Sequence, residues 1–501
     1  MKSVPDSARE ALRRLEAAGY AAYLVGGCVR DSLLGRVPGD WDITTAALPE
    51  QVEAVFAGER IIGTGLKHGT VTVLLEGLPL EITTFRTETG YSDHRHPDAV
   101  AFTPSLKEDL ARRDFTVNAM AWRPVETPLI RPSVRTGAPS PQGEGLADPF
   151  NGQADLRDKI IRCVGEPEQR FREDALRILR ALRFAAQLDF SIDPATAAAA
   201  RALRETLALV SRERIAVELT KLLCGPAARR ILTEYWEILA VPLPELAPMA
   251  GFDQRSKYHC YDVLEHSAAA VEAVPPDRIL RWAALLHDVA KPACFTLDQL
   301  GRGHFYGHAQ AGGPMTREIL TRLRFDKDTV RRVSTLVELH DYPIDPPVEM
   351  QDAGAGNKET DSSTPLRCAQ TPEQREGVQS NDAAGTRAIK KLLGRLGEED
   401  FFRLLALKRA DSLAHHPDYR GRTAACDRME ALARELLARQ EAFSLKDLAV
   451  KGSDLLALGI PKGPEIGKIL NQLLEAVLSG ELPNQREALL GKATGQGTSN
   501  K

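Results

Sequence analysis

The sequence predicts an α+β protein, with a small mixed β-sheet in an N-terminal head and a mostly α-helical remainder. Short runs of apolar and β-branched residues flanked by glycine are typical of strands, and they gather in the first 85 residues. Longer stretches with helical periodicity follow, notably 171–184. A chain of 501 residues is long enough for several domains.

Bulk composition excludes several classes of protein. The chain is 43% hydrophobic and 27% charged, which is ordinary for a globular protein, and its formal charge of −4 means that any basic surface must be local. Seven cysteines without a CxxC pair favour a reducing cytoplasm over a disulfide framework or zinc cluster. Because there is no signal peptide and no long apolar run, we expect a cytoplasmic protein that does not span a membrane.

The head begins with an expected amphipathic helix from Ser7 to Gly19, where glycine suits the C-cap. Tyr23–Val25 then predicts a buried strand, and a Gly-Gly pair separates it from an expected helix over Val29–Leu34. Pro38-Gly39 turns the chain toward Asp40–Ile43, which we expect to be extended.

The next elements are a short helix and three strands. Pro49–Phe56 is the expected helix, and the strands are expected at 60–62, 70–75 and 80–85. Gly90–Pro97 is polar and lacks periodicity, so we expect a loop there.

Two acids of the extended segment are candidate metal ligands. If Asp40 and Asp42 lie on a strand, both carboxylates share one face. That face would lie beside the glycine turn at a helix start, where backbone N–H groups can bind phosphate. Mg²⁺ prefers such oxygen ligands and keeps substrate phosphates among them. Glu81 is either a solvated strand residue or a third carboxylate of this site.

The stretch GGCVRDSLLGRVPGDWD, residues 26–42, resembles the signature of bacterial tRNA CCA-adding enzymes and poly(A) polymerases, GG-x-VRD-x-LLG-x-x-x-x-D-x-D. The resemblance implies that Gly27 and Arg30 contact an incoming triphosphate and that Asp40 and Asp42 hold Mg²⁺. It also favours Glu81 as a third catalytic carboxylate. In this family a flexible loop at the position of residues 90–97 is thought to help the switch from C to A addition.

A second motif spans Arg112 to Ala121. Its residues suit either a salt-bridged helix start or a grip on ribose and phosphate, because guanidinium groups match phosphate oxygens. The run resembles the RRDFT-x-NA motif of the same family, which binds the ribose of the nucleotide. The resemblance therefore implies that nucleotide is bound by Arg112, Arg113, Asp114 and Asn118.

The segment 171–184 is expected to form one continuous helix. On it, Asp174, Arg177, Arg180 and Arg183 make a row at i, i+3 steps. A solvated charged face is the ordinary interpretation. However, three arginines face one acid in this row, so the charges are not balanced, and Asp with Arg could hydrogen-bond the edge of a nucleobase.

Glu173-Asp174-Ala175-Leu176-Arg177 fits the EDxxR motif of CCA-adding enzymes. There the motif reads the base, so that protein rather than a template selects C and then A. Related poly(A) polymerases tend to have proline where this chain has Ala175. The resemblance implies that Glu173, Asp174 and Arg177 bind nucleotide and that Arg180 and Arg183 meet phosphates.

Helices are further expected at 195–202, 211–223, 401–413 and 426–439. In the second of these, Arg212 and Arg214 are interpreted as structural rather than RNA-binding. Two segments rich in Pro, Gly, Ser or Asn are expected to be disordered insertions. The expected domains are a head, an insertion, a neck, the first part of a histidine-rich helical domain, an insertion, the last part of that domain and a tail, at 1–126, 127–147, 148–250, 251–350, 351–386, 387–425 and 426–501.

Six of the 11 histidines lie between His259 and His340. A lone helical histidine is usually structural, but imidazole and carboxylate together suit transition metals. The order of these residues resembles that of the HD phosphohydrolase superfamily, including its binuclear members. It implies a second divalent-metal site, with metal-activated water attacking a phosphoester, formed by His266, His287, Asp288, His308, His340 and Asp411. Lys291 and His304 are candidate phosphate contacts.

The resemblance spans nearly the whole chain and implies stepwise addition of CCA to the 3′ end of tRNA from CTP and ATP. Two alternatives remain open within this class, an A-adding enzyme and a poly(A) polymerase. A third is an HD phosphohydrolase with an RNA-binding head. The sequence does not indicate an oligomeric state.

Overall fold

The computed structural model describes residues 4–63, 69–90, 99–124, 145–342, 385–420, 422–439 and 443–497. These residues form two compact units. The first contains Met1–Ala250, Pro276–Arg281 and Ile319–Asp326, and the second contains Gly251–Pro275, Trp282–Glu318 and Lys327–Lys501. The expected loop from residue 91 and most of both expected insertions lie outside the described residues.

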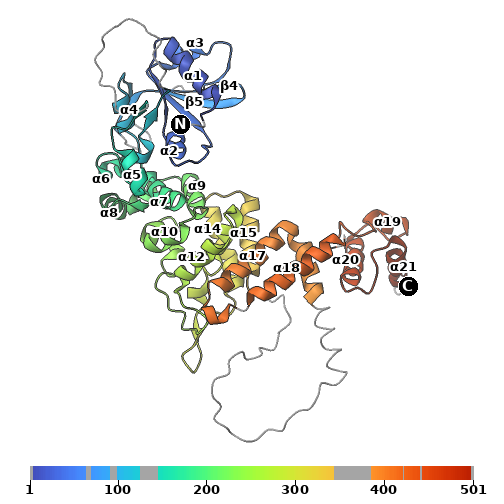
Figure 1. Ribbon diagram of the computed structural model, residues 1–501. Helices are drawn as coiled ribbons and strands as arrows, with labels where there is room; N and C mark the ends of the chain where they lie inside the picture. Colours follow the sequence, from blue (N-terminus) through green and yellow to red (C-terminus); the bar gives the residue numbers. More distant parts are fainter. Residues whose placement is uncertain are drawn as a thin grey trace. The chain divides into compact units, whose positions relative to one another are not determined.

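A seven-stranded mixed sheet organises the head (Figure 1). In spatial order its strands are β3 (Arg60–Ile62), β4 (Thr70–Leu75), β5 (Leu78–Thr84), β2 (Trp41–Thr45), β1 (Ala22–Val25), β8 (Ala121–Trp122) and β9 (Leu146–Ala147). Neighbouring strands are antiparallel except β2 and β5, which are parallel. The expected α+β class is confirmed.

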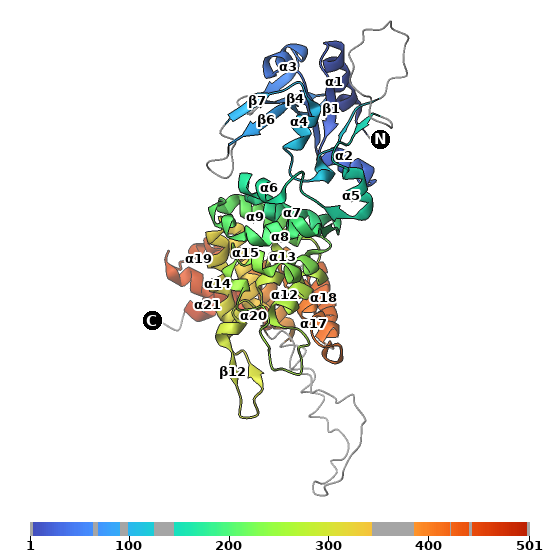
Figure 2. The ribbon, with the colours of Figure 1, turned by 90° about the vertical axis from the view of Figure 1, so that its left-hand side faces the viewer.

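Helices cover the sheet because their apolar faces match its buried positions. In α1 (Asp6–Ala17), Leu12 and Leu15 are fully buried, and this helix packs with α3 (Pro49–Val55) against β4. The glycine turn after β1 leads into α2 (Gly27–Leu33). Strands β6 (Arg86–Thr89) and β7 (Ala99–Phe102) form a separate ladder, against which α4 (Leu106–Ala111) packs (Figure 2).

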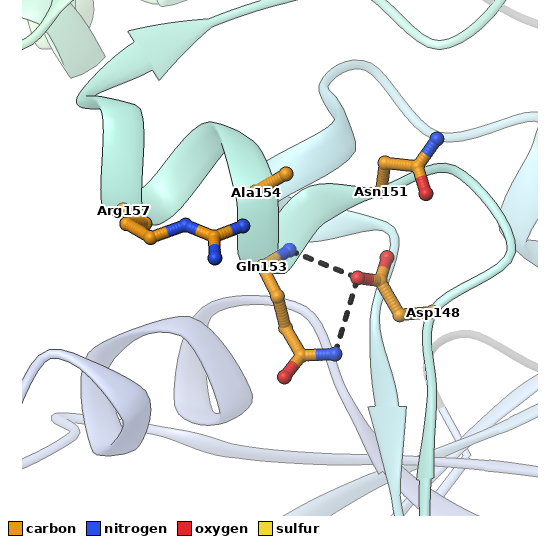
Figure 3. Close-up of a pocket in the computed structure, with 5 residues that line it drawn as sticks. All are labelled: Asp148, Asn151, Gln153, Ala154 and Arg157. Carbon is orange, nitrogen blue, oxygen red and sulfur yellow. Dashed lines mark hydrogen bonds between the residues drawn. The ribbon is translucent and has the colours of Figure 1, made fainter. Parts of the chain in front are cut away.

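The first expected insertion ends earlier than predicted. Residues 145–147, assigned to it, belong to the described structure, and two of them form β9, which pairs with β8. Asp148 then accepts a hydrogen bond from the backbone of Gly152 at 2.6 Å. It also accepts from the backbone of Gln153 at 2.9 Å and from the side-chain amide of Gln153 at 3.4 Å (Figure 3). A Cβ at position 152 would lie 2.3 Å from the Thr116 carbonyl oxygen, so this close approach requires glycine.

Helices dominate the rest of the first unit. They are α5 (Gly152–Asp158), α6 (Pro167–Glu173), α7 (Leu176–Leu188), α8 (Pro194–Ala202), α9 (Arg212–Leu223), α10 (Ala228–Glu234) and α11 (Trp236–Leu239), with β10 (Ile160–Ile161) parallel to β11 (Ser191–Ile192). Helix α7 packs along α9, and α6 packs on α8.

The expectation of one continuous helix over 171–184 is wrong. Helix α6 ends at Glu173, and Asp174 is extended, with φ −141° and ψ 105°. The Asp174 side chain instead accepts the backbone N–H of Leu176 at 3.0 Å, at the start of α7. An aspartate that bonds the backbone two residues on competes with helix propagation, which accounts for the break.

The C-terminal half is helical. It contains α12 (Val263–Ala273), α13 (Arg278–Leu286), α14 (His308–Arg322), α15 (Lys327–Leu339), α17 (Glu398–Leu413), α18 (Arg422–Ala438), α19 (Gly452–Ala457), α20 (Pro464–Leu478) and α21 (Arg486–Gly497), with a hairpin of β12 (Thr296–Leu297) and β13 (Gly303–His304). Residues 385–396 are helical, so positions 385 and 386 do not belong to the second expected insertion.

Two features of the second unit bear on its organisation. Helix α17 packs against α12, α15 and α18, and this packing brings histidines and an aspartate together. The tail has a core of its own, formed by Leu448, Val450, Leu455, Ile469, Leu473, Leu489 and Ala493. Within the described ranges, no helix combines the length and the apolar character needed to cross a bilayer.

Candidate active site and candidate metal centre

Three carboxylates come together beside the parallel strand pair of the head. Asp42 on β2 lies opposite Glu81 on β5, and Asp40 directly precedes β2. Burial raises the pKa of Asp42 to about 6, and the nearby charges of Glu81 and Asp40 act in the same direction. Acids held close enough to repel one another fit a divalent cation with oxygen ligands.

The three head carboxylates are spaced differently from the histidine groups described below. Among the described residues, the sets of three ligand atoms within 4.8 Å of one another are both in the second unit, and the three head carboxylates do not form such a set. A phosphate-bearing substrate would therefore complete the coordination of an ion here, as is usual for Mg²⁺.

The glycine turn brings α2 against the second motif. Gly26 has φ +77°, and a Cβ there would lie 3.1 Å from Nη1 of Arg113, so both conformation and contact favour glycine. Gly27 is the first residue of α2. Arg30 donates from Nη1 to Oδ1 of Asn118 at 2.7 Å, and it also pairs with Asp31. The predicted Gly27, Arg30 and Asn118 thus lie in one neighbourhood.

Arg112 and Arg113 have different surroundings. Arg112 donates to Glu88 at 2.9 Å and to Asp109 at 2.7 Å, so acids of β6 and α4 hold its guanidinium. Arg113 lies 3.7 Å from Asp109, and its buried Nε has no hydrogen-bond partner among the described residues. Burial lowers the pKa of Arg113. Of the two arginines, Arg113 is therefore the one whose Nε–H has no hydrogen-bond acceptor among the described residues.

Asp114 joins the second motif to α7. Its Oδ1 accepts hydrogen bonds from the side-chain amide of Asn118 at 3.1 Å and from the backbone N–H of Phe115 at 2.8 Å. Its Oδ2 accepts a hydrogen bond from Nε of Arg180 at 2.8 Å. Burial opposes ionisation of Asp114, but Arg180 and Asn118 outweigh it and lower its pKa to about 2. Asp114 is therefore a charged acceptor that fixes Arg180.

The expected surplus of positive charge on α7 is wrong, because each arginine of the row has an acid within reach. Arg177 pairs with Glu173 at 2.6 Å, and Arg183 on α7 pairs with Glu218 on α9 at 2.7 Å. Asp174 pairs with Arg214 of α9 at 2.7 Å. Glu173 is only four positions from Arg177, but it lies outside the i, i+3 row, and the other partners lie on distant parts of the chain, up to 66 positions away for Arg180 and Asp114.

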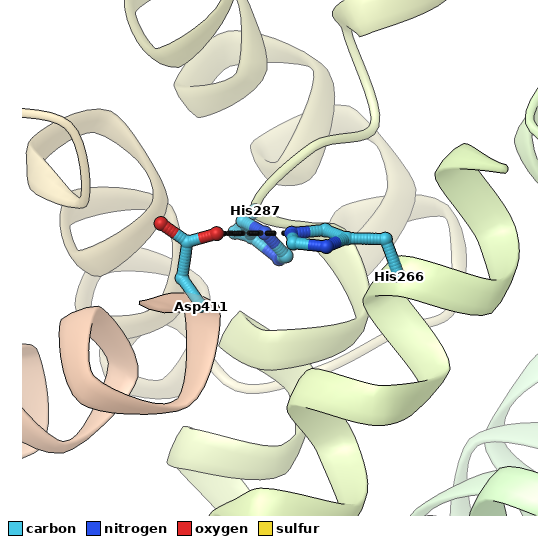
Figure 4. A group of neighbouring side chains, drawn as sticks. All are labelled: His266, His287 and Asp411. Atoms are coloured by element: carbon cyan, nitrogen blue, oxygen red, sulfur yellow. Dashed lines mark hydrogen bonds and ion pairs between the residues drawn. The ribbon is translucent and has the colours of Figure 1, made fainter. Parts of the chain in front are cut away.

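The six predicted HD residues come together in the second unit. One set of three consists of His266 from α12, His287 from the end of α13 and Asp411 from α17 (Figure 4). His266 Nε2 lies 2.9 Å from Asp411 Oδ1, and His287 Nε2 lies 3.7 Å from it.

The other set consists of Asp288, His308 and His340. Asp288 Oδ1 lies 3.4 Å from His308 Nε2 and 3.7 Å from His340 Nε2. Asp288 Oδ2 also lies 3.5 Å from Nε2 of His266, which links the two sets. Although 343–384 lie outside the described residues, Asp411 and His340 belong to the same cluster.

The imidazole orientations fit a metal centre. In all four histidines Nδ1 bonds a backbone carbonyl: His266 to Ala414, His287 to Ala284, His308 to Phe305 and His340 to Val337. This arrangement directs the Nε2 atoms at the carboxylates and is the usual support of metal-binding histidine. The buried Nε2 of His287 and Oδ2 of Asp288 lie 3.2 Å apart as an ion pair, without the geometry of a hydrogen bond.

Lys291 and His304, the candidate phosphate contacts, differ in position. Lys291 is buried, with Nζ 2.6 Å from Asp288 Oδ2 and 3.0 Å from Oε1 of Gln254. It therefore joins the cluster. His304, on β13, instead pairs with Asp298 at 3.2 Å and is not a member of either set of three.

Family models match four parts of the chain. They are the Poly A polymerase head domain at 22–162, the RNA and SrmB-binding site of polymerase A at 189–249, the HD domain at 257–415 and tRNA nucleotidyltransferase domain 2 at 419–493. Together they cover both candidate sites.

Whole relatives agree with these matches. A CCA-adding enzyme of Levilactobacillus brevis is 33% identical over 492 residues, which are 98% of this chain and 97% of that protein. One from Geobacillus thermodenitrificans is 40% identical over 322 residues, covering 60% and 75% of the two chains. The crystal structure of the Bacillus stearothermophilus CCA-adding enzyme with CTP aligns over 100% of this chain and 99% of its own, with 28% identity and a TM-score of 0.66. The chain therefore belongs to the CCA-adding enzyme family and is a nucleotidyltransferase.

Proposed function

We propose that this chain adds C, C and A in turn to the 3′ end of tRNA, using CTP and ATP, no nucleic-acid template, and releasing pyrophosphate. The observation that carries the proposal is the group of Asp40, Asp42 and Glu81 beside α2, in a chain whose relatives of nearly equal length are CCA-adding enzymes. The free cysteines of the described residues fit a protein that works in the cytoplasm.

The three carboxylates would hold Mg²⁺, which would neutralise triphosphate charge and favour ionisation of the tRNA 3′ hydroxyl. The chain's own part is mainly positioning. Arg30 and Arg113 would hold phosphates, since one is fixed by Asn118 and the other has an unpartnered donor. The 3′ hydroxyl then attacks the α-phosphate in line, and pyrophosphate leaves.

Base choice would come from Asp174 and Arg177 at the junction of α6 and α7. A carboxylate accepts hydrogen bonds and a guanidinium donates them, so the pair can distinguish the edges of nucleobases. Arg180 and Arg183 have ion-pair partners on both sides of α7, which keeps that surface in place. The tRNA acceptor would be recognised mostly by shape and backbone.

The test uses a tRNA transcript that ends at its discriminator base, labelled CTP, ATP or both, and Mg²⁺. We expect three added nucleotides with both and two with CTP alone. Growth only on tRNA ending in CC would indicate an A-adding enzyme, and long A tails would indicate a poly(A) polymerase. No incorporation by folded protein would refute nucleotidyl transfer to tRNA.

A second activity, hydrolysis of phosphoesters, is favoured by the histidine cluster. His266, His287 and Asp411 would hold one divalent metal, and the other set of three a second, supplying an activated water. The test is Mn²⁺ binding by calorimetry, followed by hydrolysis of p-nitrophenyl phosphate and its bis-ester. Metal binding without turnover of either ester would leave the cluster as a structural metal site.

A further inference from the structure

Helix α9 contacts Asp174, at the junction of α6 and α7, through Arg214. Nη2 of Arg214 donates to Oδ2 of Asp174 at 2.7 Å, across 40 positions of sequence. Both side chains are mostly shielded, with exposed fractions of 24% for Arg214 and 15% for Asp174. An ion pair that is largely removed from solvent holds its geometry better than one on the surface.

Asp174 is fixed at its other oxygen as well. Its Oδ1 accepts the backbone N–H of Leu176 at 3.0 Å, so α7 and α9 each hold one oxygen of the same carboxylate. The extended backbone at Asp174 takes it out of the helical row, so its position depends on these two bonds rather than on helix geometry. Each carboxylate oxygen has a further lone pair that can accept from a ligand.

The helix that carries Arg214 is itself anchored. One turn further along α9, Glu218 pairs with Arg183 of α7 at 2.7 Å, and both side chains are buried. Helices α7 and α9 also pack along their lengths. The part of α9 that carries Arg214 is therefore held in a fixed position against α7.

We propose that Arg214 is a specificity-determining positioning residue of nucleotide addition, which holds the Asp174 carboxylate in a fixed orientation as an acceptor for the exocyclic amino group of cytosine or adenine. The inference rests on the proposed role of Asp174 in reading the base. Cytosine and adenine present an amino donor at this edge, whereas guanine and uracil present a carbonyl acceptor. An oriented carboxylate accepts a hydrogen bond from the amino group of the first pair, whereas its oxygens repel the carbonyl oxygen of the second pair.

Loss of Arg214 is predicted to affect the discrimination between CTP and UTP rather than the overall rate of nucleotide addition. Without Arg214, one oxygen of the Asp174 carboxylate loses its hydrogen bond, so the carboxylate can turn away from the position in which it accepts from the amino group of cytosine. We expect Arg214→Gln to lower the ratio of kcat/KM for CTP to that for UTP by about 10-fold, the usual effect of losing one charge-assisted hydrogen bond. Arg214→Lys restores a cation and should recover most of the ratio.

The assay measures single-nucleotide addition to the same tRNA transcript by the full chain with CTP or UTP. Arg212→Gln is the matched control, because Arg212 lies on the same helix and makes no ion pair or hydrogen bond within the described residues. Its ratio should match that of wild type. Thermal unfolding verifies folding, and Arg214→Met, which keeps the aliphatic stem, replaces the Gln variant if that one is unfolded.

The outcomes distinguish the proposed role of Asp174 from the proposed role of Arg214. If Asp174→Asn leaves the ratio unchanged, Asp174 does not read the base, and both the proposed role and this inference fail. If Asp174→Asn lowers the ratio but Arg214→Gln and Arg214→Met do not, only the role of Arg214 fails. Equal losses with CTP and UTP in the Arg214 variants would also overturn it, since a merely structural residue would affect both substrates alike.

Discussion

Asp42→Asn should inactivate nucleotidyl transfer and, in the absence of metal, stabilise the protein. Asp42 lies opposite Glu81 and next to Asp40, and its burial with these like charges raises its pKa to about 6. The folded state therefore holds the proton more tightly than the unfolded chain does. The free energy of unfolding consequently falls as pH rises from about 4 to about 6, and the full penalty is present at pH 7.

The magnitude follows from the pKa. A rise from 3.8 to about 6 corresponds to about 3 kcal/mol at pH 7, and imperfect hydrogen bonding of the new amide reduces the gain to about 1 to 2 kcal/mol. For a unit of this size, that gain raises the melting temperature by about 2 to 6 °C.

The assay is calorimetric melting in EDTA at pH 5 and pH 7. The variant should exceed wild type at pH 7 and differ little at pH 5, whereas added Mg²⁺ should stabilise wild type more than the variant. Asp158→Asn is the control, since its carboxylate is 60% exposed beside Arg157. A variant less stable than wild type at pH 7 without metal would refute the account of a strained acidic site.

Three other substitutions test the remaining structure. Asp114→Asn should lower the free energy of unfolding by about 2 to 4 kcal/mol at pH 7, measured by urea unfolding. Because its folded pKa is lowered to about 2, the wild-type stabilisation is present above pH 4 and is lost as pH falls through 2, and the variant should lack this loss. Gly152→Ala should lower the free energy of unfolding by about 1 to 3 kcal/mol, because the new Cβ meets the Thr116 carbonyl oxygen at 2.3 Å. Gly39→Ala, whose Cβ would meet no atom within 4 Å, should leave the free energy of unfolding nearly unchanged in the same urea experiment. Asp288→Ala should lower the number of Mn²⁺ ions bound in calorimetry, because His308 and His340 lose the carboxylate of their set, and should leave CCA addition within about 2-fold of wild type; loss of CCA addition by a folded variant would contradict independent sites.

The strands of the head were predictable because local signals agree there. Residues 60–62 and 70–75 form β3 and β4 at the expected positions, and Tyr23–Val25 is part of β1. In β4 alternate residues are buried, since one face packs against helices. The β6–β7 ladder was missed because both strands, at 86–89 and 99–102, are only four residues long; β6 is polar, and β7, although apolar, is mostly exposed.

The motifs located the candidate sites, but their internal partners were not predictable. The break at Asp174 follows from a bond to Leu176 that competes with a helix of otherwise favourable sequence. The acids that pair with Arg180 and Arg183 lie on other elements. Helical spacing shows which residues share a face, and it does not show what that face contacts.

One aromatic ring orders three arginines of the candidate nucleotide site. The ring of Phe184 lies 5.0 Å from the guanidinium of Arg30, 5.4 Å from that of Arg180 and 4.0 Å from that of Arg183, and its edge meets Phe115. Each cation–π contact contributes about 0.5 to 2 kcal/mol. These arginines are therefore ordered before a nucleotide binds, so binding avoids about 0.5 to 1.5 kcal/mol per immobilised side chain. In the proposed assignment, base choice by Asp174 and Arg177 requires a triphosphate that is held in one position, and arginines fixed by an aromatic ring and by acids suit that role.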